Sequence, residues 1–158
     1  SRRQLAIIVD RWGELGYTPV VGFEMEFFLL ERQRPLTRLP VPDHRVYGID
    51  TGADPSGTLA EIGRLAEETQ LHIEGLNSEF TPGQLEAALH YQPALPAADA
   101  ALLFRELTRR VARANGVDAT YMARPFSDAV GNGLHVNMSL STDSGDNAFA
   151  DSHRFPRS

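Results

Sequence analysis

The sequence predicts an α+β fold in which helices pack on an antiparallel sheet. Three segments, residues 2–17, 56–70 and 96–116, carry apolar residues at helical spacing. The segments between them are rich in Val and Phe, or alternate apolar with polar residues, which is typical of strands. A Thr-Pro-Gly turn at 81–83 joins two of these strands directly, so antiparallel strands with interspersed helices account for the order of the elements.

The boundary residues support the helices. Gly16 is a C-cap for the first helix, Pro96 suits the N-terminus of the third, and Asn115-Gly116 ends it. The expected apolar stripes are Leu5, Ile8, Val9, Trp12 and Leu15 on the first helix, and Leu102, Leu103, Leu107 and Val111 on the third.

The strands are predicted at residues 19–30, 71–80, 84–91 (a strand, or a ribbon pairing with the one before it), 117–125 and 133–140. Residues 32–57 hold several prolines among polar residues and are predicted as a loop that leaves the core. We expect one domain over residues 1–151 and an unstructured tail at 152–158.

The composition excludes several classes of function and of metal site. The formal net charge of −6 leaves no broad basic surface to attract nucleic acid or an anionic membrane. The absence of cysteine excludes disulfides and thiolate metal sites, so a metal would need carboxylate, imidazole or water ligands. No uninterrupted apolar run is long enough to span a bilayer and no signal peptide opens the sequence, which predicts a soluble, cytoplasmic protein.

The stretch GFEMEF places Glu24 and Glu26 two residues apart within an apolar run. Side chains alternate across a strand, so both carboxylates point to the same face. Two carboxylates held so close repel unless one is protonated or a cation lies between them. The alternative is an edge strand with a solvated polar face.

A second pair, Glu79 and Glu86, flanks the Thr-Pro-Gly turn. If the turn folds the chain back on itself, these carboxylates converge on one point, where they would suit a hard cation such as Mg²⁺ or Mn²⁺. Two unrelated surface glutamates beside a polar turn are the alternative.

Two further features are weaker. His135 follows a Gly131-Asn132-Gly133 loop, whose glycines would let backbone amides approach an anion or substrate, although a structural histidine after an ordinary turn has the same pattern. Glu74 lies five residues before Glu79, an odd separation that puts the two on opposite faces of an ideal strand unless a bulge intervenes.

Together, these stretches resemble the glutamine synthetase family. The resemblance rests on GFEMEFFLL, EGLNSEFTPGQLEAAL and ARPFSDAVGNGLHVNMSL, and on their order along the chain. GLNSEFTPGQLE, with no His-His before the glutamate, is more similar to the γ-glutamylpolyamine synthetase branch than to the ammonia-using enzyme.

The resemblance implies part of a funnel-shaped catalytic domain with two or more Mg²⁺ or Mn²⁺ ions. ATP would phosphorylate the γ-carboxyl of glutamate, and ammonia, an amine or a polyamine would displace the phosphate. By resemblance, Glu26, Glu79 and Glu86 bind one metal, with Glu26 also on the substrate side, whereas Glu24 and His135 bind the second. Glu74 matches a residue on the nucleotide side, and Gly131 matches the glycine beside the substrate glutamate.

The sequence also departs from the family. The resemblance predicts a truncated chain, lacking the preceding β-grasp domain and a following segment with further arginines and a metal-binding glutamate. Asn137 stands where the family usually has a second histidine. The expected protein is a ligase of nitrogen metabolism that forms homo-oligomers when full length, whose isolated chain could lack activity. The alternatives are a catalytically inactive relative that acts as a metal- or ligand-binding module, and a plain α+β domain with solvated glutamates.

Overall fold

The computed structural model describes residues 1–33, 35–47 and 54–150, and it confirms the α+β class. The expected tail at 152–158 lies outside the described residues. The helices are α1 (Arg2–Glu14), α2 (Thr58–Glu68) and α3 (Ala94–Ala114). The strands are β1 (Tyr17–Glu31), β2 (Thr37–Arg38), β3 (Ile73–Ser78), β4 (Gln84–Leu89), β5 (Gln92–Pro93), β6 (Val117–Thr120) and β7 (Leu134–Thr142).

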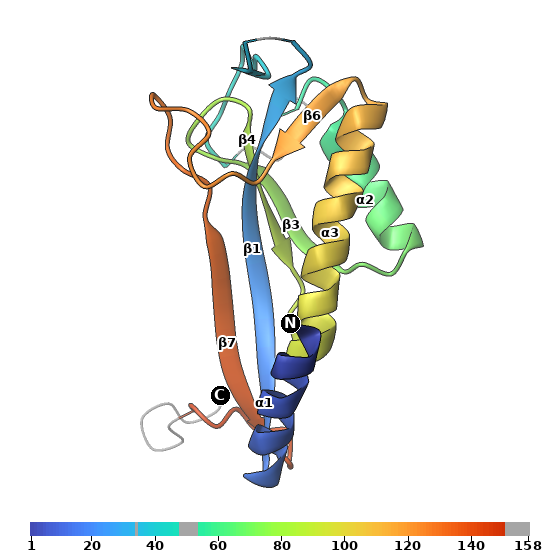
Figure 1. Cartoon of the computed structure of the whole chain (residues 1–158), viewed down its shortest axis with the longest axis vertical. Coiled ribbons are helices and arrows are strands. Elements are labelled where there is room, and N and C mark those ends of the chain that lie inside the picture. Colours follow the sequence, from blue (N-terminus) through green and yellow to red (C-terminus); the bar gives the residue numbers. More distant parts are fainter. Residues whose placement is uncertain (34, 48–53, 151–158) are drawn as a thin grey trace, which may run out of the picture.

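The long strand β1 organises the sheet. It pairs antiparallel with every other strand except β3, which pairs antiparallel with β4. Met25 is opposite both Ala87 of β4 and Leu134 of β7, so these two strands lie along opposite edges of β1. Figure 1 shows β7 on one side of β1, with β4 and β3 on the other.

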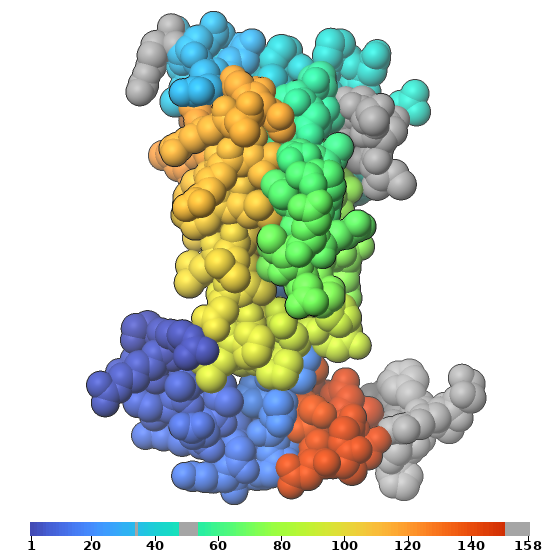
Figure 2. All heavy atoms as spheres, turned by 90° about the vertical axis from the view of Figure 1, so that its right-hand side faces the viewer, coloured from blue at the N-terminus to red at the C-terminus, as the bar shows by residue number. Residues whose placement is uncertain are grey.

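One face of the sheet is covered by helices. Met25, Phe27 and Leu29 of β1 are almost fully buried against α2 and α3, where Phe27 meets Phe104 at a centroid separation of 6.3 Å. The two helices lie side by side over the sheet, as the surface in Figure 2 shows. Burying this apolar layer is the main stabilising contribution to the fold.

The predicted apolar stripe of α3 is only partly buried. Leu102 and Leu103 are 65% and 64% exposed, whereas Leu107 packs against the core and Val111 is buried, as predicted. Phe104 and Thr108 are buried as well. The buried residues follow helical spacing and share Val111 with the predicted stripe. The small residues Ala97 and Ala100, which precede Phe104, complete the buried face.

The remaining differences concern short elements. The predicted loop at 32–57 contains the two-residue strand β2, and the predicted strand at 117–125 ends at Thr120. β7 continues to Thr142, beyond its predicted end. None of the helices that the described residues form is both long and apolar enough to cross a membrane.

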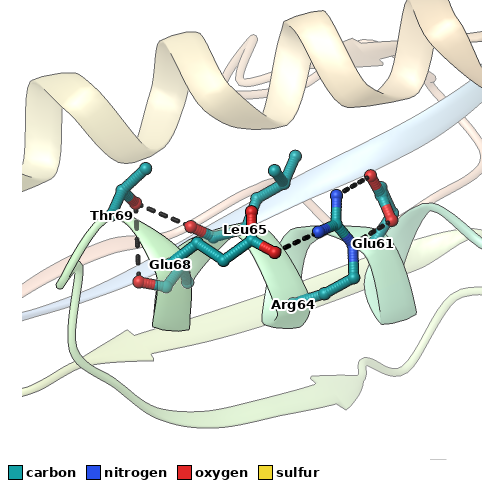
Figure 3. A network of polar contacts seen from close by, with 6 residues as sticks. Glu61, Arg64, Leu65, Glu68 and Thr69 are labelled. Atoms are coloured by element: carbon teal, nitrogen blue, oxygen red, sulfur yellow. Dashed lines mark hydrogen bonds and ion pairs between the residues drawn. The ribbon is translucent and has the colours of Figure 1, made fainter.

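Helix α2 carries its charged residues on its outer surface. Arg64 forms ion pairs with Glu61 at 2.7 Å and with Glu68, and the Thr69 hydroxyl donates to the Leu65 carbonyl oxygen at the end of the helix (Figure 3). These carboxylates are neutralised locally and lie on a helix that covers the far side of the sheet from Glu24 and Glu26.

Candidate active site

The sheet places the predicted residues on the face that α2 and α3 leave uncovered. In the antiparallel register, Glu26 is opposite Glu86, and Glu24 is opposite His135. Directly paired residues project to the same side of a sheet. Glu24 and Glu26 therefore share a face, as their spacing predicts, and β4 and β7 each add one polar side chain beside them.

A tight turn brings Glu79 to this group. Pro82 is followed by Gly83 with φ +80°, the arrangement of a type II turn, and the Gln84 amide donates to the Thr81 carbonyl oxygen at 2.9 Å. The Glu79 amide donates to the Gln84 carbonyl oxygen at 2.9 Å. The turn thus folds the chain back as expected and places Glu79 near Glu86.

Two overlapping groups of metal-ligand atoms result. Glu26, Glu79 and Glu86 form one, with one carboxylate oxygen of each within 4.8 Å of the others. Glu24, Glu86 and His135 form the other by the same measure. Glu86 belongs to both, whereas the family resemblance places it with the first metal alone.

Two of these glutamates have raised pKa values. Burial raises the pKa of Glu79 above its ordinary value, and the neighbouring Glu26 and Glu86 raise it further. The pKa of Glu86 is raised for the same reasons, first by burial and then by Glu24 and Glu26. In the part of the chain that the structure describes, no arginine forms an ion pair with these carboxylates.

These residues fit a hard divalent cation. Carboxylate oxygens with a single imidazole are ligands that Mg²⁺ and Mn²⁺ accept, and positive charge between them would relieve the repulsion that raises the pKa of Glu79 and Glu86.

Both oxygens of the Glu24 carboxylate contact side chains of β7. His135 Nδ1 lies 3.0 Å from Glu24 Oε2, and Asn137 Nδ2 donates to Glu24 Oε1 at 3.0 Å. Asn137 therefore orients a candidate metal ligand.

The glycine loop before β7 is packed closely. A Cβ atom at Gly131 would lie 2.6 Å from the Ala123 carbonyl oxygen, and one at Gly133 would lie 2.7 Å from Glu26 Oε1 and 2.9 Å from His135 Nε2. Gly133 thus leaves space between two candidate ligands, a role that the sequence did not indicate. Gly131 lines the same hollow as the carboxylates.

Glu74 lies apart from both ligand groups. The register of β3 shifts between Ile73 and Gly75, so an irregularity falls at Glu74. Its carboxylate is 2.7 Å from His90 Nδ1, and it lines a separate hollow of about 260 Å³ together with Glu24 and Asn137. The structure therefore brings Glu74 near Glu24 through a shared hollow, not through a shared group of ligand atoms.

Three residues around the carboxylates were not predicted as site residues from the sequence. Gln84 is fully buried, and its Nε2 donates to Glu26 Oε2 at 3.0 Å. The rings of Tyr47 and Phe80, which line the same hollow as the carboxylates, form an edge-to-face pair with centroids 5.7 Å apart. The signal for Gln84 was its place in the PGQLE stretch, where it alternates with Glu86 along the strand.

The family model for the glutamine synthetase catalytic domain matches residues 1–157. The chain belongs to the glutamine synthetase family. Its fold is thus that of a known class of ligases.

Individual relatives include enzymes that act on organic amines. The chain is 34% identical to gamma-glutamylputrescine synthetase of Escherichia coli (strain K12), covering 89% of this chain and 33% of the relative. It is 30% identical to a glutamate–isopropylamine ligase of a Pseudomonas species, covering 94% and 34%. A solved structure described as a GmaS/ADP complex superposes with a TM-score of 0.85 at 28% identity, covering 95% of this chain and 35% of that one. The chain thus spans about a third of the length of the curated relatives that it matches.

Proposed function

We propose that this chain forms part of the catalytic domain of an ATP-dependent carboxylate–amine ligase. The reaction would join the γ-carboxyl of glutamate to an amine through a γ-glutamyl phosphate. The observation that supports the proposal is the convergence of four carboxylates and one imidazole on the open face of the sheet, in a chain of the glutamine synthetase family.

The two ligand groups would divide the cations between them. Glu26, Glu79 and Glu86 would hold one Mg²⁺ or Mn²⁺, and Glu24, Glu86 and His135 a second, with Glu86 common to both. When bound, such cations supply positive charge where phosphoryl transfer concentrates negative charge. His135 and Asn137 would keep the Glu24 carboxylate in place for this task.

The hollows around the carboxylates suggest where the substrates would bind. Gly131 and Glu26 line a hollow of about 390 Å³ that also contains Glu79 and Glu86, which we assign to glutamate and the amine. Glu74 lines the neighbouring hollow beside Glu24, which we assign to the nucleotide side. The two amine-using relatives support an organic amine over ammonia as the nucleophile. A cytoplasmic location and assembly into homo-oligomers remain predictions.

A second candidate is a metal- or ligand-binding relative without catalysis. Asn137 favours it, because an amide in place of the usual histidine cannot carry positive charge toward a phosphate. Its side chain is occupied with Glu24 in the structure.

One assay separates the two candidates. The purified protein is incubated with Mg²⁺ and ATP, and phosphate release is measured with glutamate alone and with glutamate plus ammonium, isopropylamine or putrescine. The ligase predicts release that requires both glutamate and an amine, fastest with an organic amine. Binding of Mn²⁺ without phosphate release under any of these conditions would contradict ligase activity of this chain and support the binding module.

A further inference from the structure

Gln84, the first residue of β4, is a polar side chain in a fully buried position. Its Nε2 lies 3.0 Å from Glu26 Oε2, 3.0 Å from the Gly131 carbonyl oxygen and 3.1 Å from Asn132 Oδ1. All three neighbours are acceptors, so the amide must turn its NH₂ group toward them. The orientation of the side chain is therefore fixed by its surroundings.

The loop that Gln84 contacts is held on its other side as well. The Asn132 amide donates to the Ala123 carbonyl oxygen at 2.8 Å, and Asn132 Nδ2 donates to the Met122 carbonyl oxygen at 2.9 Å. The Glu26 amide donates to the Gly133 carbonyl oxygen at 3.1 Å. Gln84 thus lies at the point where the loop, β1 and β4 meet.

This arrangement has a cost to stability. Gln84 Oε1 is buried, and within the described residues it has no hydrogen-bond partner. A buried acceptor without a partner is unfavourable, so an apolar side chain of the same length would avoid that penalty. What the amide provides in return is its NH₂ group, which joins the Glu26 carboxylate to the loop.

We propose that Gln84 is a positioning residue that holds the Glu26 carboxylate and the Gly131–Asn132 segment in fixed positions relative to each other. It would touch neither substrate nor cation. The effect of this positioning on metal binding rests on the proposed function, in which Glu26 is a metal ligand and Gly131 lines the hollow assigned to glutamate. Partners of this kind typically contribute about ten- to a hundredfold to metal affinity.

The test compares Gln84→Met with Thr108→Val. Met keeps an unbranched side chain of similar length and removes the NH₂ group. Thr108 is equally buried but lies in α3 on the helix-covered face, where its hydroxyl donates to the Phe104 carbonyl oxygen at 2.9 Å. Thr108→Val therefore removes a buried polar group from a place remote from the carboxylates, and it controls for a general loss of stability.

Two readouts are taken on each protein. Mn²⁺ titration followed by electron paramagnetic resonance should show binding about ten- to a hundredfold weaker in Gln84→Met and unchanged in Thr108→Val. Amide hydrogen exchange without metal should be at least about tenfold faster at Asn132 and Glu26 in Gln84→Met alone, because their hydrogen bonds join the loop to the sheet.

The outcomes separate this inference from the proposed function. If the unaltered chain binds Mn²⁺ and Gln84→Met binds it equally well with unchanged exchange, the positioning role is wrong and the metal site stands. If the unaltered chain does not bind Mn²⁺, the proposed function loses its metal site. Exchange then decides the inference: faster exchange at Asn132 supports it, and unchanged exchange overturns it.

Discussion

Met25, Phe27 and Leu29 point from β1 into the apolar layer beneath α2 and α3, whereas Glu24 and Glu26 point away from it. The first face is close-packed, and its side chains stabilise the fold. The second face gathers like charges that repel, and the raised pKa values of Glu79 and Glu86 reflect this. The difference between the two faces shows that one strand can serve both stability and a reactive site, with alternation keeping the two apart.

The largest expected effect is on the packed face. Phe27 is fully buried against Phe104 and Tyr121, so Phe27→Ala should lower the free energy of unfolding by about 3–5 kcal/mol. Urea denaturation measures it. Phe149→Ala, at a phenylalanine that is 62% exposed, should change that free energy by less than about 0.5 kcal/mol. Equal losses in both variants would show that the face beneath the helices is not the core.

On the carboxylate face, Gly133→Ala should impair the site more than the fold. The added Cβ would displace the Glu26 and His135 side chains, which can move without disturbing the backbone. We expect Mn²⁺ affinity to fall by about tenfold or more, as for other changes that misplace ligands. Gly63→Ala in α2, where the Cβ meets only Leu76 at 4.0 Å, should leave the affinity unchanged. Unchanged affinity in Gly133→Ala would argue against Glu26 and His135 as metal ligands.

The pH dependence of stability should differ between the faces. Because the folded chain raises the pKa of Glu79, it binds more protons than the unfolded chain between the ordinary glutamate value and the raised one. Below the ordinary pKa of glutamate, Glu79 therefore has no effect on stability. As pH rises through the window between that pKa and the raised pKa, ionisation of Glu79 progressively destabilises the metal-free chain. Glu79→Gln should be more stable than the unaltered chain above the window and equal to it below.

The measurement is urea denaturation in a chelator from pH 4 to pH 8. A difference between the two proteins that is constant with pH would contradict the assigned cause of the shift. Adding Mn²⁺ at neutral pH should reverse the order, because binding to the folded state stabilises the unaltered chain.

The smallest effect is expected on the outer surface of α2. Arg64 pairs with Glu61 and Glu68 at exposed positions, where solvent screens ion pairs so that they contribute little to stability. Arg64→Ala should therefore lower the free energy of unfolding only slightly, as measured by urea denaturation, and leave Mn²⁺ binding unchanged. A larger loss would mean that charge, and not only packing, stabilises the helix-covered side.

Much of this arrangement follows from local rules in the sequence. The two-residue period of a strand predicts that Glu24 and Glu26 share a face, and Pro82-Gly83 predicts the turn that brings Glu79 back toward Glu86. What local rules could not provide is the position of neighbours across the sheet. The contacts of Gln84 come from a loop that lies 47 residues further along the chain, and no spacing within PGQLE indicates them.

Two other features were also beyond local patterns. The bulge at Glu74 is set by the pairing of β3 with β4, so its face could not be assigned from an odd separation. On α3, Leu107 and Val111 face the core as predicted, whereas Leu102 and Leu103 are exposed and small residues such as Ala100 are buried instead. In both cases, packing between elements overrides the pattern within one element.

The most direct test of the candidate site is the binding of Mn²⁺ to the unaltered chain and to two double variants. Glu26→Gln with Glu86→Gln removes charge from both ligand groups, and Glu61→Gln with Glu68→Gln removes the same charge from α2. Titration followed by electron paramagnetic resonance should show tight binding in the unaltered chain and in the α2 variant, and its loss in the Glu26 and Glu86 variant. Equal binding in all three proteins would contradict the claim that the carboxylates of β1 and β4 form a metal site.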